Sequence, residues 1–136
     1  MGQQQILFVI LAVCIIGIAV SVGVISMSGH AVTDNSALVE QDLKMIAKKA
    51  QDYVALQSHE GSERISLFLL SRLPDAMGRL GCSSSNAHGD FFVKKSDNLS
   101  SMQIVGVGAQ AGHDQRRPLR LVITVWADST SLAVLD

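Results

Sequence analysis

The first thirty residues of the chain contain no Lys, Arg, Asp or Glu. A secretory signal peptide normally places basic residues ahead of an apolar core of about 7 to 15 residues. Here no basic side chain precedes the apolar run, and that run, Ile6 to Met27, is 22 residues long. The missing charge therefore argues against a standard export signal and favours a segment that stays in a membrane.

The chain also has few of the residues that carry chemistry. Its two cysteines, Cys14 in the apolar run and Cys82 in a Gly/Ser-rich stretch, do not suggest an internal disulfide. None of its four histidines stands three or four residues from another, as metal ligands on one helix would. It has neither a Gly-x-Ser-x-Gly motif nor a phosphate-binding glycine loop. The sequence therefore predicts no enzyme, no catalytic residue, no metal site and no cofactor.

An excess of positive charge is missing as well. Eleven basic and twelve acidic residues give a net charge of -1, and they are spread along the chain. Nucleic-acid binding is therefore disfavoured, because it depends on a basic surface. The densest basic cluster, Arg116, Arg117 and Arg120, is interpreted as a solvated strand entrance, with contact to an acidic groove of a neighbouring subunit as the alternative.

What the N-terminus does contain is a continuous apolar run. As a helix, its 22 residues span about 33 Å, which matches a hydrocarbon core of about 30 Å. Small residues stand four apart within it, Gly17 with Ser21 and Ala19 with Gly23, and they allow another helix to approach closely. The residues assigned to this membrane and assembly helix are Ile6, Cys14, Gly17, Ala19, Ser21, Gly23 and Met27.

Two processing alternatives remain open from the residues alone. Gly29-His30-Ala31 resembles a leader-peptidase site, and cleavage there would release a soluble protein. Leu11 to Cys14 resembles a lipobox, although Val13 stands where a smaller residue is usual. Orientation is not set by charge, because no Lys or Arg occurs before Lys44.

A polar interval, residues 28–36, follows the apolar run and offers Thr33, Asp34 and Ser36 as candidate helix caps. From residue 36 to 57, apolar residues recur at helical spacing, which predicts an amphipathic helix. Its predicted core residues are Leu43, Ile46, Ala50 and Tyr53. A second helix is expected from Ser62, as N-cap, to just before Pro74.

The last third of the chain alternates between apolar and polar residues, which is typical of strands. Strands are expected at 91–95, 102–109 and 119–126, and residues 131–136 are expected to pair back as a hairpin. The face predicted to pack against the amphipathic helix is Leu119, Leu121, Ile123 and Val125. The fold class is therefore α+β: a long N-terminal helix, half membrane-spanning and half amphipathic, on a small antiparallel sheet. We divide the chain at 1–29, 30–81 and 82–136.

This layout resembles that of type IV pilins and pseudopilins: a very short polar start, a charge-poor helix running into an amphipathic one, then a small antiparallel sheet. The resemblance implies cleavage after Gly2, which would leave Gln3 as the first mature residue. The sequence departs from the family at Leu7, the fifth mature position, where Glu is usual, and in its non-basic Met1-Gly2 leader.

The resemblance implies a structural subunit that self-associates into filaments, with the membrane and a pilus assembly machinery as partners and no nucleic acid. It also implies a single membrane pass with a cytoplasmic N-terminus, followed by a place on the cell surface. The alternative from a different class is a single-pass anchored accessory or ligand-binding domain that does not polymerise.

Overall fold

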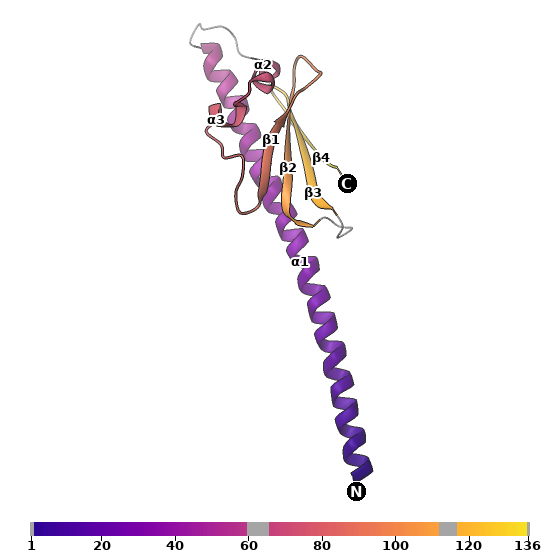
Figure 1. Ribbon diagram of the computed structural model, residues 1–136. Helices are drawn as coiled ribbons and strands as arrows, with labels where there is room; N and C mark the ends of the chain where they lie inside the picture. The colour runs from indigo at the N-terminus through magenta and orange to yellow at the C-terminus, as the bar shows by residue number, and fades with distance from the viewer. Residues whose placement is uncertain (1, 60–65, 112–116, 136) are drawn as a thin grey trace.

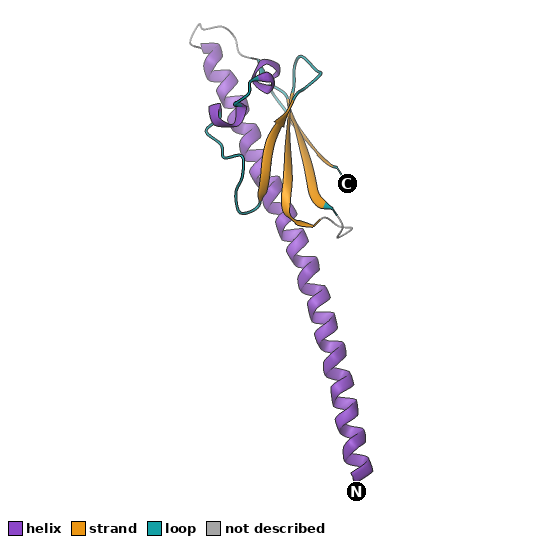
Figure 2. Ribbon diagram, in the orientation of Figure 1, coloured by secondary structure: helices purple, strands orange, loops and turns teal. Residues whose placement is uncertain are grey.

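The protein is described from a computed structural model that covers residues 2–59, 66–111 and 117–135. A single long helix, α1 (Gly2–His59), carries a four-stranded sheet on its C-terminal half, while its N-terminal half projects away from the sheet (Figure 1). Two short helices, α2 (Leu67–Arg72) and α3 (Ala76–Arg79), lie between α1 and the sheet in the chain (Figure 2). The α+β architecture predicted from the sequence is confirmed.

The helix α1 is continuous over 58 residues, or about 87 Å at 1.5 Å per residue. The polar interval at 28–36 does not interrupt it, so the caps expected at Thr33, Asp34 and Ser36 are wrong. Thr, Asp and Ser side chains cap a helix only where it begins, because only there do backbone N–H groups lack a partner in a preceding turn. Here no proline occurs before Pro74, and the preceding turn already accepts the backbone donors of these residues.

One stripe of α1 is buried, and it begins inside that polar interval. Among the helix residues whose burial is described, Asn35 is the first buried one, and the stripe continues at helical spacing through Val39, Leu43, Ile46, Ala47 and Ala50. Tyr53 and Val54 pack against the same core but are only partly buried. The sheet therefore covers one side of the helix over about four turns.

The short helices differ from the sequence prediction. Ser62 lies outside the described residues, and the helix that precedes Pro74 is α2, with Ser66 as its N-cap. The Ser66 side chain accepts a hydrogen bond from Leu69 N at 3.3 Å. Leu67 and Leu70 point into the core. The one-turn helix α3 was not predicted, because four residues are too few to show a helical period.

The sheet is an antiparallel meander with strand order β1-β2-β3-β4. Its strands are β1 (Gly89–Lys94), β2 (Met102–Ala111), β3 (Pro118–Val125) and β4 (Thr130–Val134), close to the expected positions. The register pairs Ile104 of β2 with Ile123 of β3, and Ile123 with Leu132 of β4. An irregularity in the β2–β3 pairing falls between Val107 and Ala111.

The core lies between α1 and one face of this sheet. Leu119, Leu121, Ile123 and Val125 alternate along β3 and are all buried in the cluster that contains Leu43, Ile46 and Ala50. Phe91, Met102 and Ile104 complete the inner face from β1 and β2. The strict alternation on β3 thus places one apolar face against the helix stripe.

Two glycines let the helix approach the sheet closely. A Cβ atom added to Gly106 of β2 would lie 2.9 Å from Val39 Cγ1 and 3.2 Å from Leu43 Cδ1. One added to Gly108 would lie 2.5 Å from Asn35 Oδ1. Because β2 has no side chain at these two positions, α1 packs directly on its backbone.

Candidate membrane and assembly site

The N-terminal half of α1 is apolar and uncovered. Every residue from 2 to 27 is exposed, including fifteen large hydrophobic side chains from Ile6 to Met27. Soluble monomers rarely expose a contiguous apolar surface of this size. This helix is long and apolar enough to cross a membrane, and none of its apolar window is buried inside the protein.

The residues assigned to processing and assembly all lie on this projecting half. Gly2 and Gln3 are the first residues of α1 and are exposed. Cys14 is an exposed free thiol. An added Cβ at Gly17 or Gly23 would meet nothing within 4 Å, so packing within the chain does not require glycine at either position.

The small residues form two separate surfaces. At about 100° per residue, Gly17 and Ser21 lie on one side of α1, and Ala19 and Gly23 lie on nearly the opposite side. Cys14 falls on the Gly17/Ser21 side. The spacing of four places each pair on one face, and the continuous helix separates the two pairs. Two opposite small surfaces allow a helix to contact a neighbour on each side.

Ser21 keeps its hydroxyl group within its own helix. Its Oγ donates a hydrogen bond of 2.8 Å to Gly17 O, one turn earlier. This bond satisfies the donor without a partner from another chain, which lowers the cost of placing serine in hydrocarbon. The Gly17/Ser21 side is therefore small and carries no unsatisfied donor.

A polar joint fixes the sheet to α1 at the end nearer the projecting half. Asn35, which is 8% exposed, donates from Nδ2 to His88 O at 3.0 Å and accepts from Gln110 N at 3.4 Å. Two turns further along α1, Asp42 Oδ2 accepts from Asn86 Nδ2 at 2.9 Å and lies 2.7 Å from His88 Nδ1. These contacts join α1 to both β2 and the segment before β1.

A second joint fixes the far end of the sheet. Gln51 Nε2 donates to Trp126 O at 2.8 Å and to Ser129 O at 3.2 Å, which holds the β3–β4 turn on α1. With an apolar stripe between two polar joints, helix and sheet form one body. Neither joint was predicted from the sequence. The one available signal is that Asn35 stands four residues before Val39, which places it on the same helix face as the apolar stripe.

The remaining candidates from the sequence do not form a reactive cluster in the described part of the chain. Across those residues, no group of three or more His, Cys, Asp and Glu side chains is placed to hold a metal ion. His88 is engaged with Asp42, and Cys82 packs against the core. His113 and Arg116 lie outside the described residues, whereas Arg120 is exposed on the outer face of β3.

Comparison with known proteins gives no relative from which a role could be transferred. No protein family matches the chain, and neither a curated protein nor a solved structure does.

Proposed function

We propose that this protein is a pilin-like structural subunit that polymerises through the projecting half of α1 and displays its sheet outside the membrane. The N-terminus is cytoplasmic in this proposal, and a pilus assembly machinery extracts the subunit from the bilayer. The observation that carries the proposal is one unbroken helix, of which half is packed in a domain core and half has no cover within the chain.

The charge pattern of the projecting half supports transfer between lipid and a helix bundle. No Lys, Arg, Asp or Glu occurs before Asp34, so moving this helix from lipid into a bundle requires no charged side chain to be desolvated. Its backbone groups are satisfied within the helix. Packing against like helices then depends on close contact, which small residues provide.

The rigid connection to the sheet supports a structural role. Because the sheet is fixed to α1 by the core and by the Asn35 and Gln51 joints, the position of α1 in a bundle sets the position of the sheet. A regular array of helices would therefore produce a regular outer surface of sheets. Contacts on opposite sides of one helix are the kind that give open assemblies rather than closed dimers.

The test compares two single substitutions on the projecting helix. Gly17→Leu fills the Gly17/Ser21 side, while Val22→Leu changes an exposed position between the two small surfaces and serves as the matched control. We expect the sheared surface fraction to contain fibres, seen by immunogold negative-stain microscopy, for the original chain and for Val22→Leu but not for Gly17→Leu. An original chain that is abundant in membranes and never found in fibres would contradict the proposal and favour the anchored, non-polymerising alternative.

The mature N-terminus distinguishes the processing routes. Mass spectrometry of the intact protein is expected to show a chain that begins at Gln3. A start at Val32 would indicate removal of the apolar half and would rule out assembly through it.

A further inference from the structure

A basin of about 320 Å³ lies on the outer face of the sheet. The strand ends and the loop that line it are at the end of the sheet away from the N-terminus of α1 (Figure 1). It is lined by the strands β1, β2 and β3 and by the loop 95–101 between β1 and β2. This volume is at the lower end of the range of about 300–1,000 Å³ for small-molecule sites. The basin uses no residue of the membrane and assembly helix.

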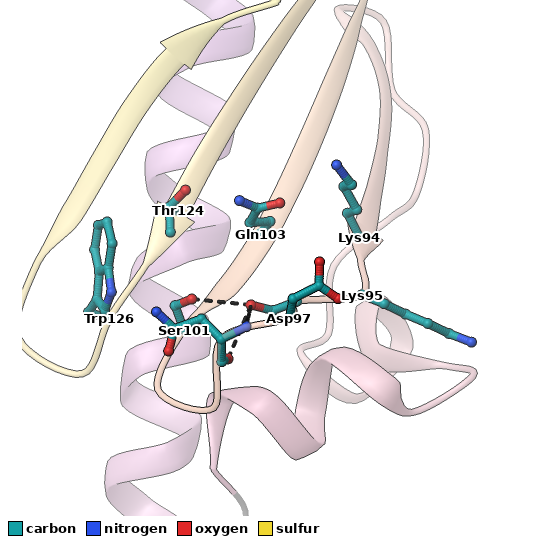
Figure 3. Close-up of a pocket in the computed structure, with 9 residues that line it drawn as sticks. Lys94, Lys95, Asp97, Ser101, Gln103, Thr124 and Trp126 are labelled. Atoms are coloured by element: carbon teal, nitrogen blue, oxygen red, sulfur yellow. Dashed lines mark hydrogen bonds between the residues drawn. The ribbon is translucent and has the colours of Figure 1, made fainter.

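A row of polar side chains crosses the floor of the basin. The register pairs Lys94 with Gln103, and Gln103 with Thr124, so the three side chains stand side by side on adjacent strands. Figure 3 shows Trp126 at one end of this row and Asp97 on the loop below it. Lys95 points away from the row. Among the described residues, the side chains of this row make no hydrogen bond or ion pair with the protein.

The loop and the turn around the basin are held by hydrogen bonds within the protein. On the loop, Ser96 Oγ lies 3.2 Å from Ser101 Oγ and accepts from Asn98 N at 3.1 Å, and both serines are buried. Asn98 Oδ1 accepts from Ser100 N at 3.1 Å. The turn that bears Trp126 is held by Gln51. A ligand would therefore meet a pre-formed site, which lowers the ordering cost of binding.

The mixture of groups indicates the chemistry of the ligand. The row offers an ammonium, an amide and a hydroxyl group, and Asp97 adds a carboxylate that opposes the Lys94 charge. Asp97 offsets the charge of Lys94, and Lys95 points away from the row, so the row offers an anion no net positive charge. A ligand rich in hydroxyl groups can both donate to and accept from these groups. The electron-rich face of an indole attracts the weakly positive C–H groups of a sugar ring. We propose that this basin binds a neutral saccharide.

The sole tryptophan of the chain lies in the basin, so its fluorescence reports on this site alone. The full chain, in a zwitterionic detergent without a sugar headgroup, is titrated with maltotriose, cellotriose and triacetylchitotriose. Inorganic phosphate and a thymidine oligonucleotide are titrated in parallel. We expect a saturable fluorescence change with at least one saccharide and none with the two anions.

Variants of the floor show whether the change reports the proposed site. Gln103→Ala and Thr124→Val each remove hydrogen-bonding groups and are expected to weaken saccharide binding about tenfold. Arg120→Ala, at the opposite end of the same sheet face, is the matched control and should bind as the original chain does. Thermal unfolding of each variant, followed by circular dichroism, checks that the fold is kept.

Three results would overturn the proposal. The first is that none of the three saccharides gives a saturable fluorescence change. The second is that phosphate or the oligonucleotide gives one in place of a saccharide. The third is that folded floor variants bind the saccharide with the same affinity as the original chain. The assay measures binding to detergent-solubilised chains, so a negative result does not contradict the filament proposal. In the same way, an absence of fibres does not contradict the saccharide proposal.

Discussion

At the scale of single residues, four of the described glycines form two groups with different physical roles. Gly106 and Gly108 face α1 at distances that leave no room for a Cβ atom. Gly17 and Gly23 face open space within the chain. Glycine in a helix interior costs about 1 kcal/mol relative to alanine, so contacts outside the chain are the natural reason for the second group. Substitution is therefore expected to destabilise the fold in the first group and not in the second.

Gly106→Val is expected to lower the free energy of unfolding by about 1–3 kcal/mol, because the added side chain must displace Val39, Leu43 and Phe91. Thermal unfolding in detergent, followed by near-ultraviolet circular dichroism, measures the change. The control Gly17→Ala should not lower the unfolding temperature. An unchanged unfolding temperature in Gly106→Val would contradict the close approach of α1 to β2.

Asn35 gives a second prediction at this scale. Asn35→Ala removes two part-buried hydrogen bonds, which leaves Gln110 N without this acceptor, while His88 O keeps its bond from Ala109 N at 2.8 Å. We expect a loss of about 1–3 kcal/mol in the free energy of unfolding. The exposed neighbour gives the control, Asp34→Ala, for which a change within about 0.5 kcal/mol is expected. Equal effects of the two substitutions in chemical denaturation would show that the joint does not stabilise the fold.

At the scale of elements, patterns within one segment were predictable, and so was the strand face that packs on the helix, whereas the polar contacts between segments were not. The alternation at 119–126 predicts β3 and its buried face, since a strand exposes its two faces with period two. The absence of charge up to Asp34 predicts the projecting half of α1. In contrast, polar residues at 33, 34 and 36 suggested a helix start because their side chains commonly cap helices, and the surrounding helix overrode this local preference.

The candidate sites divide in the same way. The small residues of the projecting half were found by their spacing, because neighbours on a helix are four apart. The basin was not found, since Lys94, Gln103 and Thr124 come from three strands whose register the sequence does not show, and Trp126 follows the third strand. The Asp42–His88 contact joins residues 46 apart and was missed for the same reason.

The docking of α1 on the sheet can be tested without disturbing the projecting half. Leu43→Ala removes a fully buried side chain, and a loss of about 2–5 kcal/mol in the free energy of unfolding is expected for the sheet domain. The control Met45→Ala changes an exposed position on the same helix. Limited proteolysis should cleave the sheet domain faster in Leu43→Ala only, while both variants stay in the membrane fraction. Loss of the Leu43→Ala variant from the membrane fraction would show that membrane retention also depends on the packing of the sheet-bearing half of α1.

At the scale of the whole molecule, one helix carries two different kinds of surface. Its first half has an apolar surface suited to lipid, and its second half is the support of a folded domain. The division falls near Asn35, where burial by the sheet begins. Retention in the membrane should therefore depend on the first half and not on the second.

The double variant Ile16→Asp, Val20→Asp places two acidic residues in the middle of the projecting half. Each is expected to cost about 2.5–3.5 kcal/mol of membrane insertion. Carbonate extraction of membranes should then release a larger fraction of this variant than of the original chain, while Met45→Asp on the sheet-bearing half stays with the membrane. Equal retention of the double variant would contradict a membrane-spanning position for residues 6–27.

The most direct test of the central claim uses the thiol at Cys14, which lies on the Gly17/Ser21 side of α1 and is exposed. With Cys82→Ser as background, Cys14 is the single thiol of the chain, and membranes are treated with copper phenanthroline and analysed on a non-reducing gel. We predict a disulfide-linked dimer that is lost on Gly17→Leu and kept on Val22→Leu. A chain that fractionates with membranes and remains monomeric under saturating oxidation would contradict association through this half of the helix.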